Sequence, residues 1–213
     1  MYVPTHFEET RTEVLHQLIR KHSQAVLVTL GSGGLTANHI PFELDPDPAP
    51  LGILRGHVAR ANPVWQDLSK DIEALVVFQG PQAYISPSWY QTKKQTGKVV
   101  PTYNYIVVHA HGALRVVQDK AWLRALVERL TNRFEGQRAE PWRVTDAPGE
   151  FVDKLLGAIV GLEMPVTRLI GKWKLSQNRP QEDRDGVVRG LSESGDAEQL
   201  AIARLVNESE PRS

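Results

Sequence analysis

The chain contains no cysteine. Without a thiol it can form no disulfide, no thiolate nucleophile and no zinc–thiolate site. It also lacks net charge, because 25 lysine and arginine residues balance 25 aspartate and glutamate residues among the 213. A neutral chain has no overall field that would draw it to nucleic acid or to an anionic membrane, although local patches are not excluded by the sum.

Long apolar runs are absent as well. No run approaches the roughly 18 residues of a membrane helix, and the first residues, MYVPTHFEET, lack the basic and apolar regions of a signal peptide. We therefore expect a cytoplasmic protein with no membrane partner. The motifs GxGxxG, GxxxxGK[ST], HExxH and GxSxG are also missing, which disfavours Rossmann, P-loop, zincin and serine-elbow chemistry.

Short β-type segments dominate the first part of the chain. Residues 25–30 and 35–44 flank a glycine-rich turn and predict a hairpin, and residues 51–58 predict a further strand. In total we expect six or more short strands. They should be mostly antiparallel, because their connections are short, and helices should pack outside them. This pattern favours a β-barrel or strongly curled sheet, and a β-sandwich is the alternative.

The composition changes near the C-terminus. Residues 179–213 hold five arginines and eight acidic residues, so their net charge is 5 − 8 = −3. We predict two short helices there, near 181–192 and 196–206, which form an acidic extension of a 1–178 domain and pack on it or on a dimer partner. The second helix carries a single cation, Arg204, so it does not resemble a DNA-recognition helix.

Polar and aromatic residues gather in four segments, at 37–45, 56–65, 85–105 and 171–179. Each segment mixes a cation, an amide and a ring at or near the end of a predicted strand. A ligand that carries both a phosphate and a flat ring system needs that mixture, because phosphates take cations and amides while flat rings take apolar walls.

One of these segments contains a candidate phosphate corner. Arg60 lies just past a predicted strand, with His57 before it and Asn62 after it. Asn62 and Pro63 predict the start of a short helix, whose N-terminus would favour an anion. The alternative is a surface arginine beside an ordinary helix cap.

Lysines 172 and 174 alternate around Trp173, so both lysines face one side of a predicted strand. They can reach an anion while the indole packs behind them. A solvated strand face over a core tryptophan is the alternative.

His109 and His111 also share one strand face. Two imidazoles alone make a weak metal site, because a catalytic zinc usually takes three protein ligands. We favour a structural or ligand-adjacent role for this pair and predict no metal site.

Six long motifs occur in a fixed order along the chain: MYVPTHF, ANHIPFELD, GHVARANPVW, FQGPQAYISPSWY, VPTYNYIVVHAHG and GKWKLSQNR. Together they resemble the FMN-binding negative transcriptional regulators, the family of the protease synthase and sporulation negative regulatory proteins, and the similarity continues into 183–191. The resemblance implies a mainly β fold with flanking helices, a six-stranded antiparallel split barrel like that of pyridoxamine-phosphate oxidase. It also implies a homodimer that holds FMN at the subunit interface.

The resemblance further implies where the flavin would lie. The strand that carries Asn38 would border the ring edge, and Arg60 would be the main cation for the phosphate. The family usually has tryptophan where Tyr103 stands, so the aromatic wall here is smaller. The cofactor-binding residues predicted in this way are Asn38, His39, Ile40, Pro41, His57, Arg60, Asn62, Trp89, Pro101, Tyr103, Asn104, Lys172, Lys174 and Gln177.

Three functions are compatible with these features. The first is an FMN-binding protein that acts as a negative transcriptional regulator, although the charge pattern gives a DNA partner little support. The second is an FMN-dependent oxidoreductase, similar to flavin reductases or pyridoxamine-phosphate oxidase, in which His39, His57 or Tyr103 would serve as the acid–base group. The third is a haem-binding split barrel with His109 or His111 as axial ligand.

Overall fold

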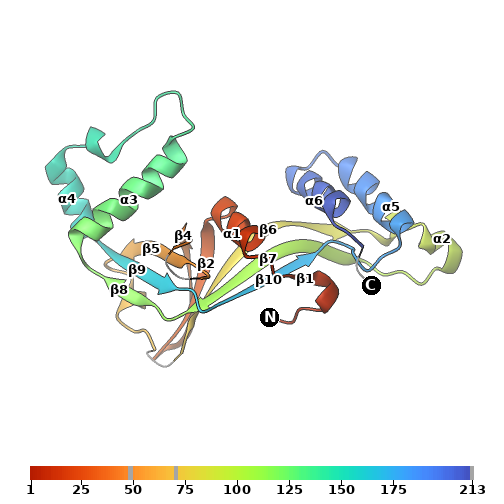
Figure 1. Cartoon of the computed structure of the whole chain (residues 1–213), viewed down its shortest axis with the longest axis horizontal. Helices are drawn as coiled ribbons and strands as arrows, with labels where there is room; N and C mark the ends of the chain where they lie inside the picture. The colour runs from red at the N-terminus through yellow and green to blue at the C-terminus, as the bar shows by residue number, and fades with distance from the viewer. Residues whose placement is uncertain (48–49, 70–71, 212–213) are drawn as a thin grey trace. The chain divides into compact units, whose positions relative to one another are not determined.

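The computed structural model describes residues 1–47, 50–69 and 72–211 (Figure 1). The strands are β1 Glu8–Glu9, β2 Gln24–Gly31, β3 Gly34–Pro41, β4 Glu43–Asp45, β5 Ile53–Ala59, β6 Ala74–Ile85, β7 Thr102–Gly112, β8 Arg115–Val117, β9 Ile159–Pro165 and β10 Arg168–Lys174. The α-helices are α1 Thr12–Lys21, α2 Thr92–Thr96, α3 Lys120–Glu135, α4 Gly149–Gly157, α5 Gln181–Ser192 and α6 Ala197–Glu208. Short 3-10 helices are η1 Thr5–Phe7, η2 Pro63–Trp65, η3 Pro87–Trp89 and η4 Val144–Asp146. The predicted class, mainly β with flanking helices, is confirmed.

The chain forms two compact units. Unit 1 comprises Met1–Leu18, Gln79–His109 and Ile170–Ser213, and unit 2 comprises Ile19–Phe78 and Ala110–Leu169. Strands β6, β7 and β10 begin in one unit and end in the other.

Unit 2 contains the predicted hairpin. Strands β2 and β3 pair antiparallel from Gln24 opposite Pro41 to Gly31 opposite Gly34, which confirms the hairpin. Residues of β2 alternate between buried and partly exposed, as expected for a strand with one face on a core. Gly34 has a φ of 101°, a conformation that favours glycine at the end of this turn.

A second sheet in unit 2 has the strand order β4-β5-β9-β8, and the β4–β5, β5–β9 and β8–β9 pairs are antiparallel. Helices α3 and α4 contact each other beside it and bury a cluster that includes Leu123, Val152 and Leu156 (Figure 1). Asp119 begins α3, because its carboxylate accepts a hydrogen bond of 2.7 Å from the Trp122 amide. Helices that pack beside the strands, as the sequence predicts, are therefore present.

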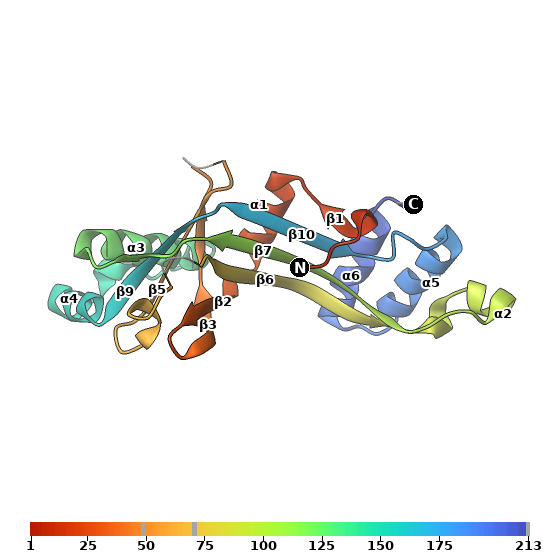
Figure 2. The same ribbon diagram turned by 90° about the horizontal axis from the view of Figure 1, so that it is seen from below.

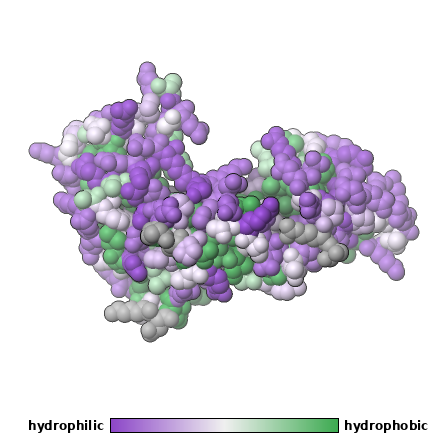
Figure 3. Space-filling model, in the orientation of Figure 1, coloured by the Kyte–Doolittle hydropathy of each residue, from purple (hydrophilic) through white to green (hydrophobic). Residues whose placement is uncertain are grey.

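In unit 1 the strands follow the order β1-β10-β7-β6 (Figure 2). Helices α5 and α6 pack against each other and bury apolar side chains such as Val187 and Ile202. The outer surface over α2 and α5 is largely hydrophilic (Figure 3), as expected when the apolar faces point inward. Both predicted C-terminal helices are confirmed in position.

Helix α5 also packs against η3. Gly186 and Gly190 lie one turn apart on α5, and a Cβ at either position would overlap Trp89, its carbonyl oxygen at Gly186 and its indole at Gly190. Only glycine leaves the space that this close approach needs.

Residues 91–98, QTKKQTGK, contain no apolar anchor, and their sequence alone predicts a mobile basic loop. The structure differs, because residues Thr92–Thr96 form α2. The anchor is polar: the buried Asp183 carboxylate accepts hydrogen bonds from the Thr92 amide at 2.9 Å and the Thr92 hydroxyl at 2.7 Å. Gly97 then ends the helix with a φ of 66°.

Candidate functional site

A cleft of about 380 Å³ lies in unit 2 where the end of β3 approaches β5. We call it the β3–β5 cleft. Its lining consists of Asn38, His39, Ile40, Pro41, His57, Val58, Ala59, Asn62 and Ile159. The fold thus brings together the predicted site residues of unit 2, with Arg60 as the exception. Apolar walls with a few polar groups are typical of sites for flat heteroaromatic ligands.

Two asparagines form the polar wall of this cleft. The Asn62 Oδ1 accepts a hydrogen bond of 3.0 Å from the Val64 amide at the start of η2, which confirms the predicted helix cap. Because that oxygen is fixed as the acceptor, the Asn62 Nδ2 donates to the Asn38 Oδ1 at 2.8 Å. The Asn38 amide nitrogen is thereby oriented as a donor for a ligand.

His57 contributes a neutral ring to the same cleft. Its Nδ1 is buried and has no hydrogen-bond partner among the described residues. Burial lowers the pKa of His57 below its ordinary value of 6.5. The ring is therefore uncharged at neutral pH and suits a neutral polar edge, such as a carbonyl or ring nitrogen, better than a phosphate.

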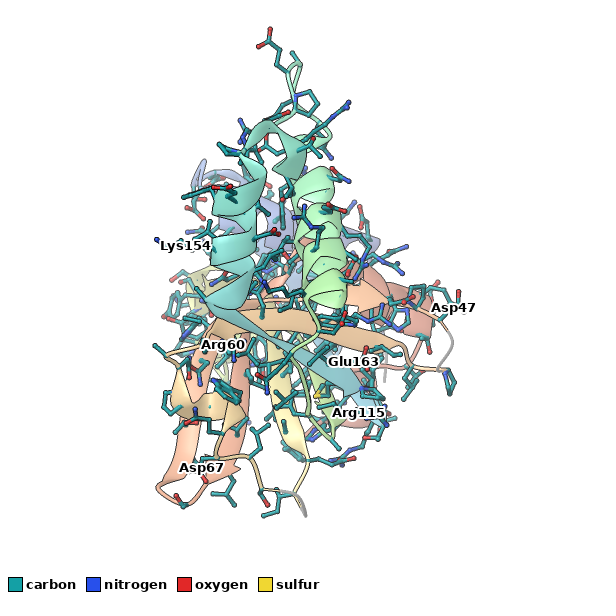
Figure 4. All side chains as sticks on the ribbon, turned by 90° about the vertical axis from the view of Figure 1, so that its left-hand side faces the viewer. Asp47, Arg60, Asp67, Arg115, Lys154 and Glu163 are labelled. Atoms are coloured by element: carbon teal, nitrogen blue, oxygen red, sulfur yellow. The ribbon has the colours of Figure 1, made fainter. Side chains whose placement is uncertain are left out.

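Arg60 lies near the C-terminal end of α4 (Figure 4) and is held by the protein itself. Its Nε donates to the Gly157 carbonyl at 2.8 Å, and its Nη2 donates to the Ile159 carbonyl at 3.1 Å. Its Nη1 donates to the Gln118 side chain at 2.9 Å, and the guanidinium lies 5.8 Å from the Trp65 ring centroid. These contacts give Arg60 a structural task, and its role as phosphate ligand stays a prediction.

A groove of about 450 Å³ adjoins the asparagine pair in unit 2. Asn38 and Asn62 line both hollows, and the groove is bounded further by the glycines of the β2–β3 turn and by Asp67. The Asp67 carboxylate accepts hydrogen bonds from the Ser32 amide at 2.8 Å and hydroxyl at 2.9 Å. Our sequence reasoning missed this groove, because the turn glycines indicated only a turn.

The predicted residues of unit 1 form a second group around the end of β10. The Lys174 ammonium donates to the Thr102 hydroxyl, and the Lys172 ammonium donates to the Tyr2 carbonyl at 3.1 Å. The Asn104 amide donates to the Ser176 hydroxyl at 3.0 Å inside the unit. Within the part of the chain that the structure describes, the hydrogen-bond partners of Lys172 and Lys174 are therefore neutral.

Three other predicted residues of unit 1 have different surroundings. Trp89 packs against the glycine face of α5, as described above. The Tyr103 side chain is 54% exposed and meets Tyr84 edge-to-face, with ring centroids 5.8 Å apart. Pro101 is exposed. Tyr103 is thus free to contact a ligand, whereas Trp89 is part of the helix packing.

Among residues 1–47, 50–69 and 72–211 there is no group of three or more histidine or acidic residues that could hold a metal ion. Within the same ranges no helix is both long enough and apolar enough to cross a membrane.

Comparison with known proteins identifies the family. The family model described as "Putative FMN-binding domain" matches residues 1–168. The chain belongs to this family. The similarity identified from the six sequence motifs is confirmed, and the match to the FMN-binding domain covers both the β3–β5 cleft and Arg60.

Relatives of known sequence extend over nearly the whole chain. The Uncharacterized protein AN0679 of Emericella nidulans is 35% identical over 243 residues, which cover 98% of this chain and 97% of the relative. The Protease synthase and sporulation protein PAI 2 of Bacillus subtilis is 32% identical over 94% of this chain and 95% of its own length.

Solved structures share the fold. The flavocytochrome Anf3 from Azotobacter vinelandii has a TM-score of 0.60 at 10% identity, covering 84% of this chain and 75% of that chain. The FAD and haem binding protein from Mycobacterium smegmatis has a TM-score of 0.58 at 17% identity, covering 89% of this chain and 80% of that chain. The predicted split-barrel fold is therefore confirmed.

Proposed function

We propose that the protein binds FMN and that the ring system of the flavin occupies the β3–β5 cleft. The observation that carries this proposal is the match of the FMN-binding domain model to residues 1–168, which contain every residue lining the cleft. A flavin, when bound, supplies redox chemistry, so the protein need only bind and orient it.

The chemistry of the cleft supports a flavin. Ile40 and Pro41 offer apolar walls to a flat ring, while the Asn38 amide and the His57 imidazole are neutral hydrogen-bonding groups. The polar edge of a flavin ring presents carbonyl oxygens and ring nitrogens, which are also neutral, so no charge has to be buried without compensation.

Titration of the purified full-length protein with FMN, followed by visible absorbance, tests the proposal. We expect Asn38→Ala and His57→Phe each to weaken FMN binding by roughly fivefold, because each removes one hydrogen bond worth about 1 kcal/mol. Asn207→Ala, on the exposed face of α6, is the matched control and should bind like the wild type. Absence of FMN binding by the folded wild-type protein would overturn the proposal.

We further propose a homodimer with the flavin at the subunit interface, as the family resemblance implies. Sedimentation with and without FMN tests it. A monomer that binds FMN with unchanged affinity on dilution would contradict the interface location.

A negative regulatory role is the finer proposal, and it follows from the family resemblance of the six motifs; the name of the Bacillus relative refers to protease synthase and sporulation. Helix α6 has acidic neighbours and one cation, Arg204, so any DNA contact would use another surface. Two assays separate this role from that of an FMN-dependent oxidoreductase. A regulator should shift DNA in a gel assay, with an affinity that falls as the salt concentration rises. An oxidoreductase should show flavin-dependent turnover in an assay without DNA.

A further inference from the structure

A cavity of about 410 Å³ lies in unit 1 between β10, α1 and the end of α6. We call it the β10–α6 cavity. Every residue that lines it belongs to unit 1. The match to the FMN-binding domain ends at residue 168, so it leaves out nearly all of β10 and the whole of α6. The volume falls within the range of small-molecule sites in proteins, about 300–1,000 Å³.

An indole ring forms the apolar side of the cavity. Strand β1 pairs with β10 (Figure 2), so that Glu9 lies opposite Gly171. A Cβ at Gly171 would overlap the Glu9 carbonyl and press on the Trp173 ring, so glycine leaves the space that the indole needs on this face of β10. Trp173 stays partly exposed, and Leu175 and Leu205 add apolar surface to the lining.

The backbone beside the indole is fixed by buried polar contacts. The Gln177 Oε1 accepts a hydrogen bond of 2.7 Å from the Leu175 amide, and the Gln177 Nε2 donates to the Trp173 carbonyl at 2.6 Å. Gln177 lines the cavity and is 5% exposed. Such preorganisation reduces the entropy that a ligand must offset on binding.

A buried ion pair forms one polar wall. The Glu9 side chain is 5% exposed, and its carboxylate accepts hydrogen bonds from the Arg11 Nε at 2.9 Å and from the Arg11 Nη2 at 2.6 Å. The guanidinium therefore balances the charge of Glu9. A ligand meets a neutral pair on this side of the cavity.

The C-terminal end of α6 forms the opposite polar wall and is held by a buried arginine. Arg184 of α5 is 3% exposed, and its Nη2 donates to the Val206 carbonyl at 2.7 Å and to the Ser209 hydroxyl at 2.9 Å. A cation suits the carbonyl end of a helix. Because Ser209 itself lines the cavity, this contact fixes the wall in place.

Two carboxylates on this wall lack a cation. Glu208 and Glu210 line the cavity and are exposed, and neither forms an ion pair with any residue in the ranges 1–47, 50–69 and 72–211. Glu208 is the last residue of α6, where the partial negative charge of the helix end disfavours a carboxylate. A positive group bound in the cavity would offset both effects.

We propose that the β10–α6 cavity binds a small organic ammonium ion, with its apolar body against Trp173 and its charge toward Glu208 and Glu210. An indole face and carboxylates both attract a cation, and the same groups repel an anion. The site lies in unit 1 and does not depend on the flavin proposal, which concerns residues of unit 2.

The probe is 2-phenylethylammonium, and 2-phenylethanol and phenylacetate are the neutral and anionic molecules of similar size. In the ¹⁵N-labelled full-length protein, the ammonium ion should shift the indole N–H resonance of Trp173 until saturation. The Trp173→Phe variant assigns that resonance. The alcohol and the acid should bind at least roughly threefold more weakly, because they lack the positive charge. Equal binding of the three molecules overturns the proposal, as does the absence of any shift in the folded protein.

Charge variants test the carboxylates. Glu208→Gln and Glu210→Gln should each weaken binding of the ammonium ion by roughly threefold, as expected for exposed charges, and added salt should weaken binding to the wild type. Glu198→Gln is the matched control, because Glu198 is an exposed residue of α6 outside the cavity lining. Equal affinities in all three variants and the wild type would contradict the proposed orientation of the ligand.

A filling variant tests the cavity itself. Gln17 is an exposed lining residue of α1, so Gln17→Trp should fill space without removing a buried side chain and should abolish the Trp173 shift. Glu13→Trp, on the same helix and outside the lining, should keep it. Circular dichroism checks that both variants are folded. An undiminished shift in folded Gln17→Trp would overturn the site.

Titration with FMN separates this proposal from the flavin proposal. Glu208→Gln and Gln17→Trp should bind FMN like the wild type. A protein that binds the ammonium ion but no FMN would refute the flavin proposal and support this one. A protein that binds FMN but gives no Trp173 shift with the ammonium ion would refute this proposal alone. Displacement of the ammonium ion by FMN would show that the cavity is not a separate site and would also overturn it.

Discussion

Cations have different partners in two parts of the molecule. In unit 2, Arg55 lies between Asp45 at 2.6 Å and Glu163 at 3.0 Å, and Arg129 meets Glu43 at 2.9 Å. Near the end of β10 in unit 1, Lys174 donates to the Thr102 hydroxyl, Lys172 donates to the Tyr2 carbonyl, and Arg179 lies over the Tyr90 ring. Removing a paired cation leaves a carboxylate without its partner, whereas removing a cation with neutral partners does not. The contrast separates cations whose loss should destabilise the fold from cations whose loss should not.

Replacing Arg55 should have the largest effect on stability. Arg55→Met removes two ion pairs and leaves the partly buried Glu163 without its partner, so the free energy of unfolding should fall by about 2–4 kcal/mol. Urea unfolding measures the change. Arg115→Met is the control, because Arg115 is exposed and only lies opposite Glu163 in the β8–β9 register (Figure 4). Equal losses in the two variants would remove the distinction between paired and unpaired cations.

Asp183 tests how unit 1 uses a buried carboxylate. Asp183→Ala leaves the Thr92 amide and hydroxyl without their acceptor, so we expect a loss of about 1.5–3 kcal/mol and faster hydrogen exchange of the Thr92 amide. The exposed Asp185→Ala provides the comparison within α5. Unchanged Thr92 exchange would mean that α2 is held by something other than this carboxylate.

The pH dependence of stability tests His57. Its pKa is lowered in the folded protein, so the unfolded chain takes up a proton near the ordinary value of 6.5 while the folded protein does so only at lower pH. The contribution of the neutral His57 ring to the free energy of unfolding is therefore fully present above pH 6.5 and should decline as the pH falls below this value. We expect a shallower decline in His57→Gln, measured by thermal unfolding at a series of pH values. Parallel curves for the two proteins would argue against burial of the ring.

Lys174 should give the smallest change. Because burial and two neighbouring cations disfavour its charge, Lys174→Met should alter the free energy of unfolding by less than about 0.5 kcal/mol or raise it slightly. A large loss of stability would mean that Lys174 is a structural cation like Arg55.

Much of the cleft could be predicted from the sequence. Asn38 and His39 lie on one arm of a hairpin, and His57 and Asn62 lie on the next strand and the helix after it, so nearby segments assemble this wall. Ile159 was missed, because it reaches the cleft through the β5–β9 pairing of segments far apart in the sequence. Only long-range sheet order could have revealed it.

The end of β10 was predicted less completely. Alternation predicts that Lys172 and Lys174 share a face, but nothing in the sequence predicts the positive φ of Ser176 in the turn after β10. Trp89 was predicted to contact the cofactor because of its motif, and the spacing of Gly186 and Gly190 was the overlooked signal for its packing.

The place of β10 has a consequence for how the chain is made. Strand β10 lies between β1 and β7, although the ribosome synthesises both of those strands first. Until β10 emerges, β1 has no neighbour on that side and β7 exposes an unpaired edge, which is the kind of surface that invites association between nascent chains. The strands of unit 1 can therefore be completed only after Lys174 has been synthesised, and a chain that stops before Arg168 would leave that edge open.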